Sequence, residues 1–134
     1  MKRVSFDFDG TLTDHRVEQF CSTLAAQGYE VWITTLRFAD EHIDTLNYPS
    51  YDNQEVYDCA SRIGIKRQHI QFCNETGNKL PQLIDKDFAF HLDDDPYIIR
   101  AITQIMPHII VDVCKPGWEK QCLERLADWN NKIT

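Results

Sequence analysis

The chain has 134 residues, a hydrophobic fraction of 43% and a formal net charge of −7 at pH 7. This length suits one domain with one core. The acidic balance argues against broad binding to a nucleic-acid backbone, which needs clustered lysines and arginines. No apolar run is long enough to cross a membrane. The first strand begins almost at Met1, which leaves no room for a signal peptide, so we expect a cytoplasmic protein.

The cysteines are odd in number and show no CxxC spacing; they are Cys21, Cys59, Cys73, Cys114 and Cys122. Most of them fall where a helix or strand would bury a small apolar side chain. We therefore interpret them as reduced core thiols, not as zinc ligands or disulfides. The negative net charge does not exclude a single bound phosphate, because a metal ion can supply the positive charge.

Strand and helix patterns alternate along the chain. A strand at residues 4–8 is followed by helical spacing over 17–25, with Thr13 or Asp14 as N-cap and Gly28 just past the end. A second strand at 30–34 and a short helix at 38–46 come next. Residues 52–55 resemble a capping box that opens a helix ending at Gly64.

The second half continues the alternation. Strands are predicted at 69–73, 88–92 and 108–113, with helices at 79–84, from Pro96 onward, and from 116 to about 130. Asp95 is a suitable N-cap for the helix that begins at Pro96. Strands that alternate with helices imply a parallel sheet with right-handed crossovers. Ligands of such sheets bind at the carboxyl ends of the strands.

Two carboxylates stand where the first strand ends. Residues 5–14 read Ser-Phe-Asp-Phe-Asp-Gly-Thr-Leu-Thr-Asp, so Asp7 and Asp9 come just before Gly10. Neighbouring acids repel each other unless a cation or a shared proton relieves them. A hard cation such as Mg²⁺, bound by oxygen ligands, is the usual relief. A surface turn at Asp-Gly is the simpler reading, but it does not explain both acids, the glycine and the threonine together.

A second group of acids, Asp93, Asp94 and Asp95, follows the fourth strand. Three consecutive acids at a strand end are costly unless a cation is present. Asp95 is explained by its role as N-cap, and the alternative is that all three are cap and turn residues. Both acid groups are expected at the same edge of the sheet.

The string Asp-Phe-Asp-Gly-Thr-Leu-Thr resembles the first motif, DxDGT[LV]T, of the haloacid dehalogenase-like (HAD) hydrolase superfamily. The acids after the fourth strand resemble its fourth motif. The resemblance covers nearly the whole chain and implies a single Rossmann-like α/β domain. Its five-stranded parallel sheet would have the order 3-2-1-4-5, with helices on both faces. We expect no cap domain, because residues 14–29 and 36–78 are used by the core elements.

The resemblance also implies roles for the acids. Asp7 would be the nucleophile that forms an aspartyl-phosphate, and it would bind Mg²⁺ together with the backbone carbonyl of Asp9. The Asp9 side chain would act first as general acid and then as general base. Asp93, with Asp94 as second choice, would complete the metal ligands, and Gly10 would contribute to phosphate binding.

The second and third motifs of the family are matched more loosely. Thr34 or Thr35 would bind the phosphoryl group, with Thr34 preferred, although a plain pair of strand threonines is the alternative. Lys79 would offset the negative charge and bind phosphate; its rival Lys86 precedes the fourth strand, at the wrong edge of the sheet. Arg37 could reach an anionic substrate or be solvated. His91 is expected to pack within its strand.

These features predict a Mg²⁺-dependent phosphomonoester hydrolase that acts on a phosphorylated substrate. The second acid of the first motif favours phosphoryl transfer, because family dehalogenases lack it. An open site is typical of members that act on large substrates such as phosphoproteins or nucleic-acid ends, and a homo-oligomer could cover the site for a small one. The alternatives are a phosphotransferase and a metal-binding regulatory or interaction module with little activity. A receiver domain is disfavoured because residues 69–73 contain no aspartate.

Overall fold

The structure is a computed structural model that describes residues 2–41, 52–74 and 77–133. The elements follow one another in the order β1 (Arg3–Phe6), η1 (Phe8–Leu12), α1 (His15–Ala26), β2 (Glu30–Thr35), α3 (Gln54–Ile63), η2 (Arg67–His69), β3 (Ile70–Phe72), α4 (Leu80–Ile84), β4 (Phe88–Asp93), α5 (Pro96–Ile105), β5 (Ile110–Asp112) and α6 (Trp118–Ile133). Here η1 and η2 are short helical turns.

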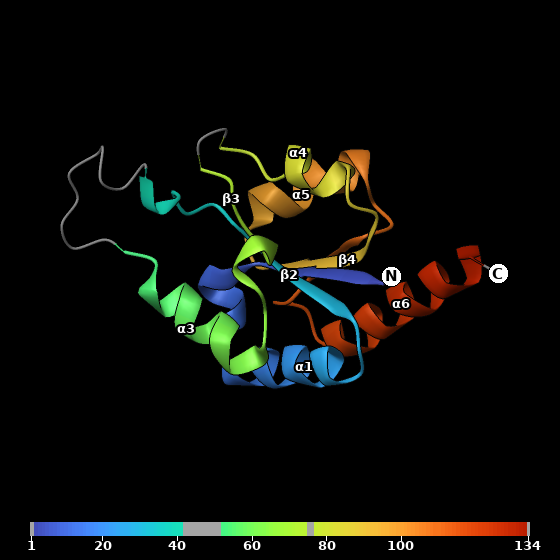
Figure 1. The fold of residues 1–134 in the computed structure, drawn as a ribbon. Coiled ribbons are helices and arrows are strands. Elements are labelled where there is room, and N and C mark those ends of the chain that lie inside the picture. The colour runs from blue at the N-terminus through green and yellow to red at the C-terminus, as the bar shows by residue number, and fades with distance from the viewer. Residues whose placement is uncertain (1, 42–51, 75–76, 134) are drawn as a thin grey trace.

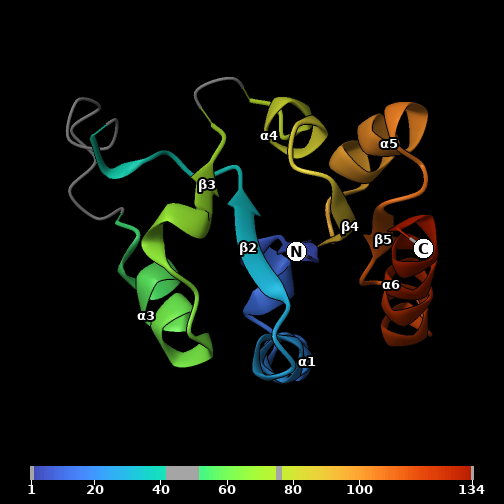
Figure 2. The same cartoon turned by 45° about the vertical axis from the view of Figure 1, so that its right-hand side comes forward.

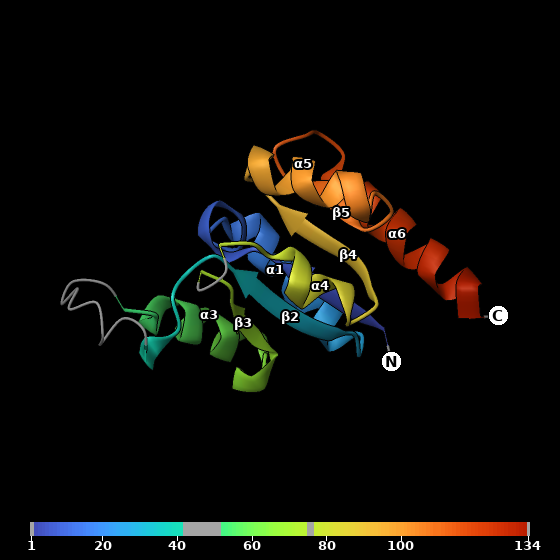
Figure 3. The same ribbon diagram turned by 90° about the horizontal axis from the view of Figure 1, so that it is seen from above.

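The strands form one five-stranded sheet in the order β3-β2-β1-β4-β5. Every neighbouring pair is parallel, so the carboxyl ends of all strands meet at one edge. Figure 3 shows the arrowheads of β2 and β4 pointing toward the same end of the sheet. The predicted fold class and strand order are therefore confirmed.

Helices cover both faces of the sheet, as predicted. Figures 1 and 2 show α4 and α5 on one side of it and α1, α3 and α6 on the other. The larger core cluster includes Val17 of α1, Val56 of α3 and Trp118 of α6. The smaller cluster includes Leu83 of α4 and Ile102 of α5. The central strands are thus buried on both faces, which explains their apolar sequences.

The first strand ends earlier than predicted, and this places Asp7. Strand β1 stops at Phe6, and the Asp7 N–H donates to the Leu92 carbonyl at 2.9 Å. Within η1 the backbone departs from helical geometry at Asp9 and at Gly10, where φ is 77°. Asp7 and Asp9 consequently do not stay on one face of a strand.

The helix starts are only partly as predicted. Asp14 and Asp95 are N-caps, and each accepts a backbone N–H two residues later at 2.9 Å. The capping box predicted at 52–55 is wrong. Asp52 accepts the N–H of Gln54 at 3.1 Å, while the Glu55 side chain turns away to bind Arg37.

Most of the helix predicted at 38–46 lies outside the described residues. The part of the chain that is described contains only the sheet and its helices, with no inserted second domain. None of its helices has the length and apolarity that a membrane span requires. Four of the five cysteines are buried as predicted, and Cys114 is exposed.

Candidate active site

The carboxyl edge of the sheet holds a cavity of about 330 Å³. Both predicted acid groups reach it, the first just after β1 and the second at the end of β4. Lys79 enters from the segment before α4, and Thr35 from the end of β2. The cavity is lined by Asp7, Asp9, Thr35, Leu36, Lys79, Asp93, Asp94, Asp95, Pro96 and Ile98. Parallel α/β sheets usually bind ligands at this edge.

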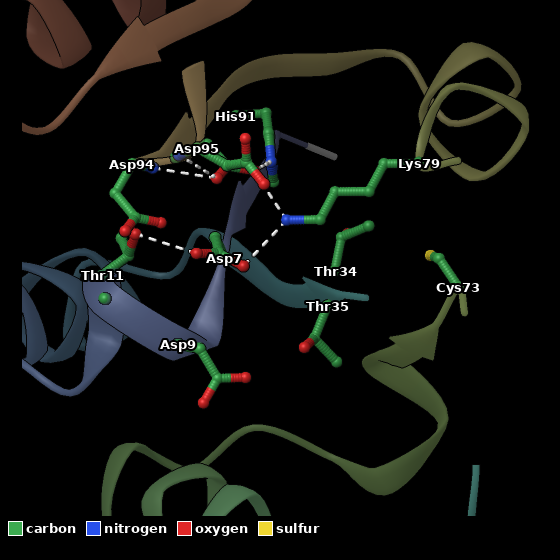
Figure 4. A network of polar contacts seen from close by, with 12 residues as sticks. Asp7, Asp9, Thr11, Thr34, Thr35, Cys73, Lys79, His91, Asp94 and Asp95 are labelled. Atoms are coloured by element: carbon green, nitrogen blue, oxygen red, sulfur yellow. Dashed lines mark hydrogen bonds and ion pairs between the residues drawn. The ribbon is translucent and has the colours of Figure 1, made fainter. Parts of the chain in front are cut away.

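Lys79 lies at the centre of the site and is 1% exposed. Its Nζ lies 2.8 Å from Asp7 Oδ1 and 2.6 Å from Asp93 Oδ2, and Figure 4 shows the ammonium reaching in toward Asp7. Burial works to lower the pKa of Lys79, but Asp93 and Asp7 outweigh it and raise that pKa, so the ammonium stays charged. Lys86, the rival, lies instead 5.5 Å above the ring of Trp32.

Asp7 is a buried carboxyl group with an unusual pKa. Burial raises the pKa of Asp7 to about 8; Lys79 opposes this rise, while Asp93 and Asp94 add to it. Thr11 Oγ1 donates a hydrogen bond to Asp7 Oδ2 at 3.1 Å. Asp7 therefore needs more positive charge than Lys79 provides if it is to be ionised at neutral pH.

Asp93 differs because its carboxylate already receives four donors. Oδ2 is bound by Lys79 and by Nε2 of His91, at 2.6 and 2.7 Å. Oδ1 accepts the backbone N–H groups of Asp94 and Asp95, at 2.9 and 3.1 Å. Burial works to raise the pKa of Asp93, but His91 and Lys79 outweigh it and hold that pKa below its ordinary value. These donors match the number of lone pairs on a carboxylate.

Behind Asp93, a chain of polar side chains crosses the sheet, all of them buried except the half-buried Gln71. Gln71 Nε2 donates to Thr34 Oγ1 at 2.9 Å, and Ser5 Oγ lies 2.8 Å from both Thr34 Oγ1 and His91 Nδ1. Burial lowers the pKa of His91, so its ring is neutral. With Nε2–H donating to Asp93, Nδ1 accepts from Ser5, Ser5 accepts from Thr34, and every donor has an acceptor.

The structure therefore corrects the preference for Thr34. Its hydroxyl is held within the sheet by Ser5 and Gln71, whereas Thr35 lines the cavity. Neither Ser5 nor Gln71 is singled out by the sequence patterns, and His91 is expected in its strand without these hydrogen bonds. The available signal was a polar residue inside each of several otherwise apolar central strands, because buried polar groups must find partners.

Gly10 contributes space to the site. A Cβ atom on this residue would lie 2.1 Å from Asp94 Oδ2, closer than any real contact. The Gly10 N–H donates to Thr13 Oγ1 at 3.2 Å. The glycine thus permits the turn after β1 to pass against the Asp94 carboxylate, and its role in phosphate binding stays a prediction.

Asp9 makes a different contact from the other acids. Arg37 donates to both of its oxygens, from Nε at 2.8 Å and from Nη2 at 2.7 Å. Figure 4 shows the Asp9 side chain directed away from Asp7. The Arg37 side chain is only 10% exposed and also binds Glu55. The solvated arginine considered in the sequence analysis is therefore wrong, and the Asp9 carboxylate stands apart from the other three.

The remaining acids fit a divalent cation. Asp7, Asp93 and Asp94 each offer an oxygen, and these atoms lie within 4.8 Å of one another. Lys79 provides one positive charge for three carboxylates, and hard oxygen ligands are those that Mg²⁺ prefers. Because Asp93 is saturated with donors, Asp7 and Asp94 are the better placed direct ligands.

No protein-family model, no curated protein and no solved structure matches this chain. The proposed function therefore rests on the chemistry of the site itself.

Proposed function

We propose that the protein is a Mg²⁺-dependent phosphatase that hydrolyses phosphomonoesters through Asp7. The observation that carries this proposal is the buried Lys79 ammonium between Asp7 and Asp93, with Asp94 beside them at the carboxyl edge of the sheet. A carboxylate nucleophile next to a fixed cation and a metal-ligand group is suited to attack on an anionic phosphoryl group.

In the proposed reaction, an oxygen of Asp7 forms a bond to phosphorus while the ester P–O bond breaks. Asp9 donates a proton to the departing oxygen and later removes one from the water that hydrolyses the aspartyl-phosphate. Lys79 and Thr35 hold the phosphoryl oxygens. A bound Mg²⁺ would lower the negative charge that otherwise keeps Asp7 and the phosphate apart.

The two acids after β4, Asp93 and Asp94, would have different roles. Asp94, which faces Gly10, would be the direct metal ligand. Asp93 would position Lys79, because its oxygens are already engaged by Lys79, His91 and two backbone N–H groups. This reverses the order of preference from the sequence, and Asp7 and Asp94 would be the residues that hold the metal directly.

The substrate proposal follows from the open cavity. No second domain covers the site among the residues that the structure describes, so a phosphorylated macromolecule has access to it. A homo-oligomer that covers the cavity would instead select a small substrate. We place the reaction in the cytoplasm.

The test is phosphate release from a panel of phosphomonoesters, nucleotides, phosphopeptides and phosphorylated oligonucleotides. Each is assayed with Mg²⁺ and with EDTA, on the wild type, on Asp7→Asn and on a control, Asp128→Asn, which changes an exposed acid on α6. We expect release that requires Mg²⁺ and Asp7 and is unchanged in the control. Equal turnover in Asp7→Asn would refute the proposal. Transfer to added alcohols in place of water would indicate a phosphotransferase, and inactivity on the whole panel would favour a binding module.

A further inference from the structure

We propose that Arg37 determines substrate specificity by binding a second anionic group of the substrate, and that this binding releases Asp9 for catalysis. The inference rests on the proposed phosphatase function and adds a substrate class to it. The preferred substrate would carry a phosphate or carboxylate beside the phosphate that is removed.

The first step is that Asp9 is bound by Arg37 and not by the groups around Asp7. Both of its oxygens accept N–H groups of Arg37, at 2.8 and 2.7 Å. An acid that gives its proton to an oxygen near Asp7 must come within hydrogen-bond reach of that oxygen. Asp9 therefore has to leave Arg37 before it can act, and something has to take its place on the guanidinium.

The second step is that Arg37 is anchored while Asp9 is not. The Arg37 guanidinium lies 5.0 Å from the ring centre of Phe8, donates to the Asp52 carbonyl at 3.2 Å and pairs with Glu55. The side chain of Arg37 is 10% exposed, whereas that of Asp9 is 57% exposed. The exposed carboxylate is the partner that can move, and the guanidinium is the part that stays.

The third step is that Asp9 lies at the cavity and that Arg37 is hydrogen-bonded to two residues that line it. Asp9 and Thr35 both line it, and the backbone N–H of Arg37 donates to Thr35 Oγ1 at 3.3 Å. A ligand whose phosphoryl group lies at Asp7 and Lys79 would thus extend toward Arg37. Guanidinium binds planar carboxylates and phosphates through two parallel N–H bonds, which is the geometry that Asp9 now occupies. A substrate anion would compete with Asp9 for the same donors.

The test measures binding and does not require turnover. The ligands are methylphosphonate, which has one anionic group, and methylenediphosphonate, which has two; phosphonoacetate tells a carboxylate from a phosphate as the second group. Calorimetry at saturating free Mg²⁺ compares the wild type with Arg37→Ala, Arg37→Lys, Asp9→Asn and a control, Arg16→Ala, whose side chain is 76% exposed. Thermal melts verify that each variant is folded.

We expect Arg37→Ala to lower the affinity for methylenediphosphonate about tenfold, as loss of a charge-assisted contact worth about 1.4 kcal/mol implies. The affinity for methylphosphonate should change by less than about twofold. Arg37→Lys should recover part of the loss. Asp9→Asn should raise the affinity for methylenediphosphonate by about threefold or more, because the ligand no longer displaces a carboxylate from Arg37. Arg16→Ala should match the wild type.

The opposite signs of the two variants separate this proposal from a structural role. If the Arg37–Asp9 pair only stabilised the loop, Arg37→Ala and Asp9→Asn would both lower the affinity for both ligands. That result would overturn the inference. So would equal affinities in the wild type and Arg37→Ala, or no binding of any phosphonate. Phosphate release that needs Asp7, together with unchanged diphosphonate affinity in Arg37→Ala, would leave the phosphatase intact and remove the specificity proposal.

Discussion

Charged side chains are arranged differently at the two ends of the parallel sheet. At the amino end Arg3 pairs with Glu30, which also accepts the Trp32 indole N–H at 3.0 Å. Trp32 in turn stacks on His69 with ring centres 4.4 Å apart. The acid Glu30 is thus paired with one arginine, whose side chain is 38% exposed.

At the carboxyl end, Asp7, Asp93 and Asp94 lie close together, and Lys79 pairs with the first two. Asp7, Asp93 and Lys79 are all buried. Matched charges such as those of the amino end need no ligand. Burial raises the pKa of Asp7, the carboxylates of Asp93 and Asp94 add to that rise, and a bound cation would offset it. The difference favours the carboxyl end as the proposed binding site, which would form at some cost in stability.

The largest effect should come from breaking the buried ion pairs. Lys79→Met leaves Asp7 and Asp93 without their ammonium, so we expect a loss of about 3–5 kcal/mol in the free energy of unfolding. The matched change at the amino end, Arg3→Met, should cost about 0–1 kcal/mol because its pair is partly solvated. Urea denaturation measures both. Equal losses would show that the two ends do not differ as described.

A smaller effect is expected from filling the space beside Asp94. Gly10→Ala introduces a Cβ atom that would lie 2.1 Å from Asp94 Oδ2 at a φ of +77°, whereas Gly28, at a φ of +94°, has nothing within 4 Å of its Cβ position. Gly28→Ala should cost about 1–2 kcal/mol from backbone strain. Gly10→Ala should cost about 1–3 kcal/mol more from overpacking.

Gly10→Ala should also weaken Mg²⁺ binding, measured by calorimetry, because Asp94 must move. Unchanged Mg²⁺ affinity in a folded Gly10→Ala protein would argue against Asp94 as a direct ligand. Gly28→Ala lies outside the site and serves as the control for strain alone.

The smallest effect is the pH dependence that Asp7 confers. Its pKa rises from 3.8 to about 8 on folding, so between these values the folded protein holds a proton that the unfolded chain has released. The stability due to this group must therefore fall as the pH rises through that window and level off above it. Relative to Asp7→Asn, the wild type should lose about 1–2 kcal/mol between about pH 6.5 and pH 8.

Thermal or urea unfolding across this pH range measures the difference between the two proteins. Mg²⁺ should restore stability to the wild type above pH 7, because it competes with the proton on Asp7 and binds only the folded state. Parallel pH profiles for the wild type and Asp7→Asn would contradict the raised pKa of Asp7.

The limits of sequence reasoning are clearest at Thr34 and Thr35. Adjacent strand residues point to opposite faces, so the choice between them depends on how β2 pairs with its neighbours. The Thr34 hydroxyl is hydrogen-bonded to Gln71 of β3 and to Ser5 of β1, whereas Thr35 lines the cavity. Asp9 is similar, because its partner Arg37 is 28 positions away and no local pattern joins them.

The sequence itself determined the order of strands and helices, the N-cap at Asp95, and the presence of acids at the ends of β1 and β4. It left Thr13 and Asp14 as alternatives for the first N-cap, and the structure selects Asp14. These features follow from side-chain periodicity and from hydrogen bonds between near neighbours. The donors that each carboxylate receives were decided only by the tertiary structure. Lys79 is 72 positions from Asp7, and Ser5 is 86 positions from His91. Only a folded sheet brings such residues within hydrogen-bond distance and removes the water that would otherwise bind them.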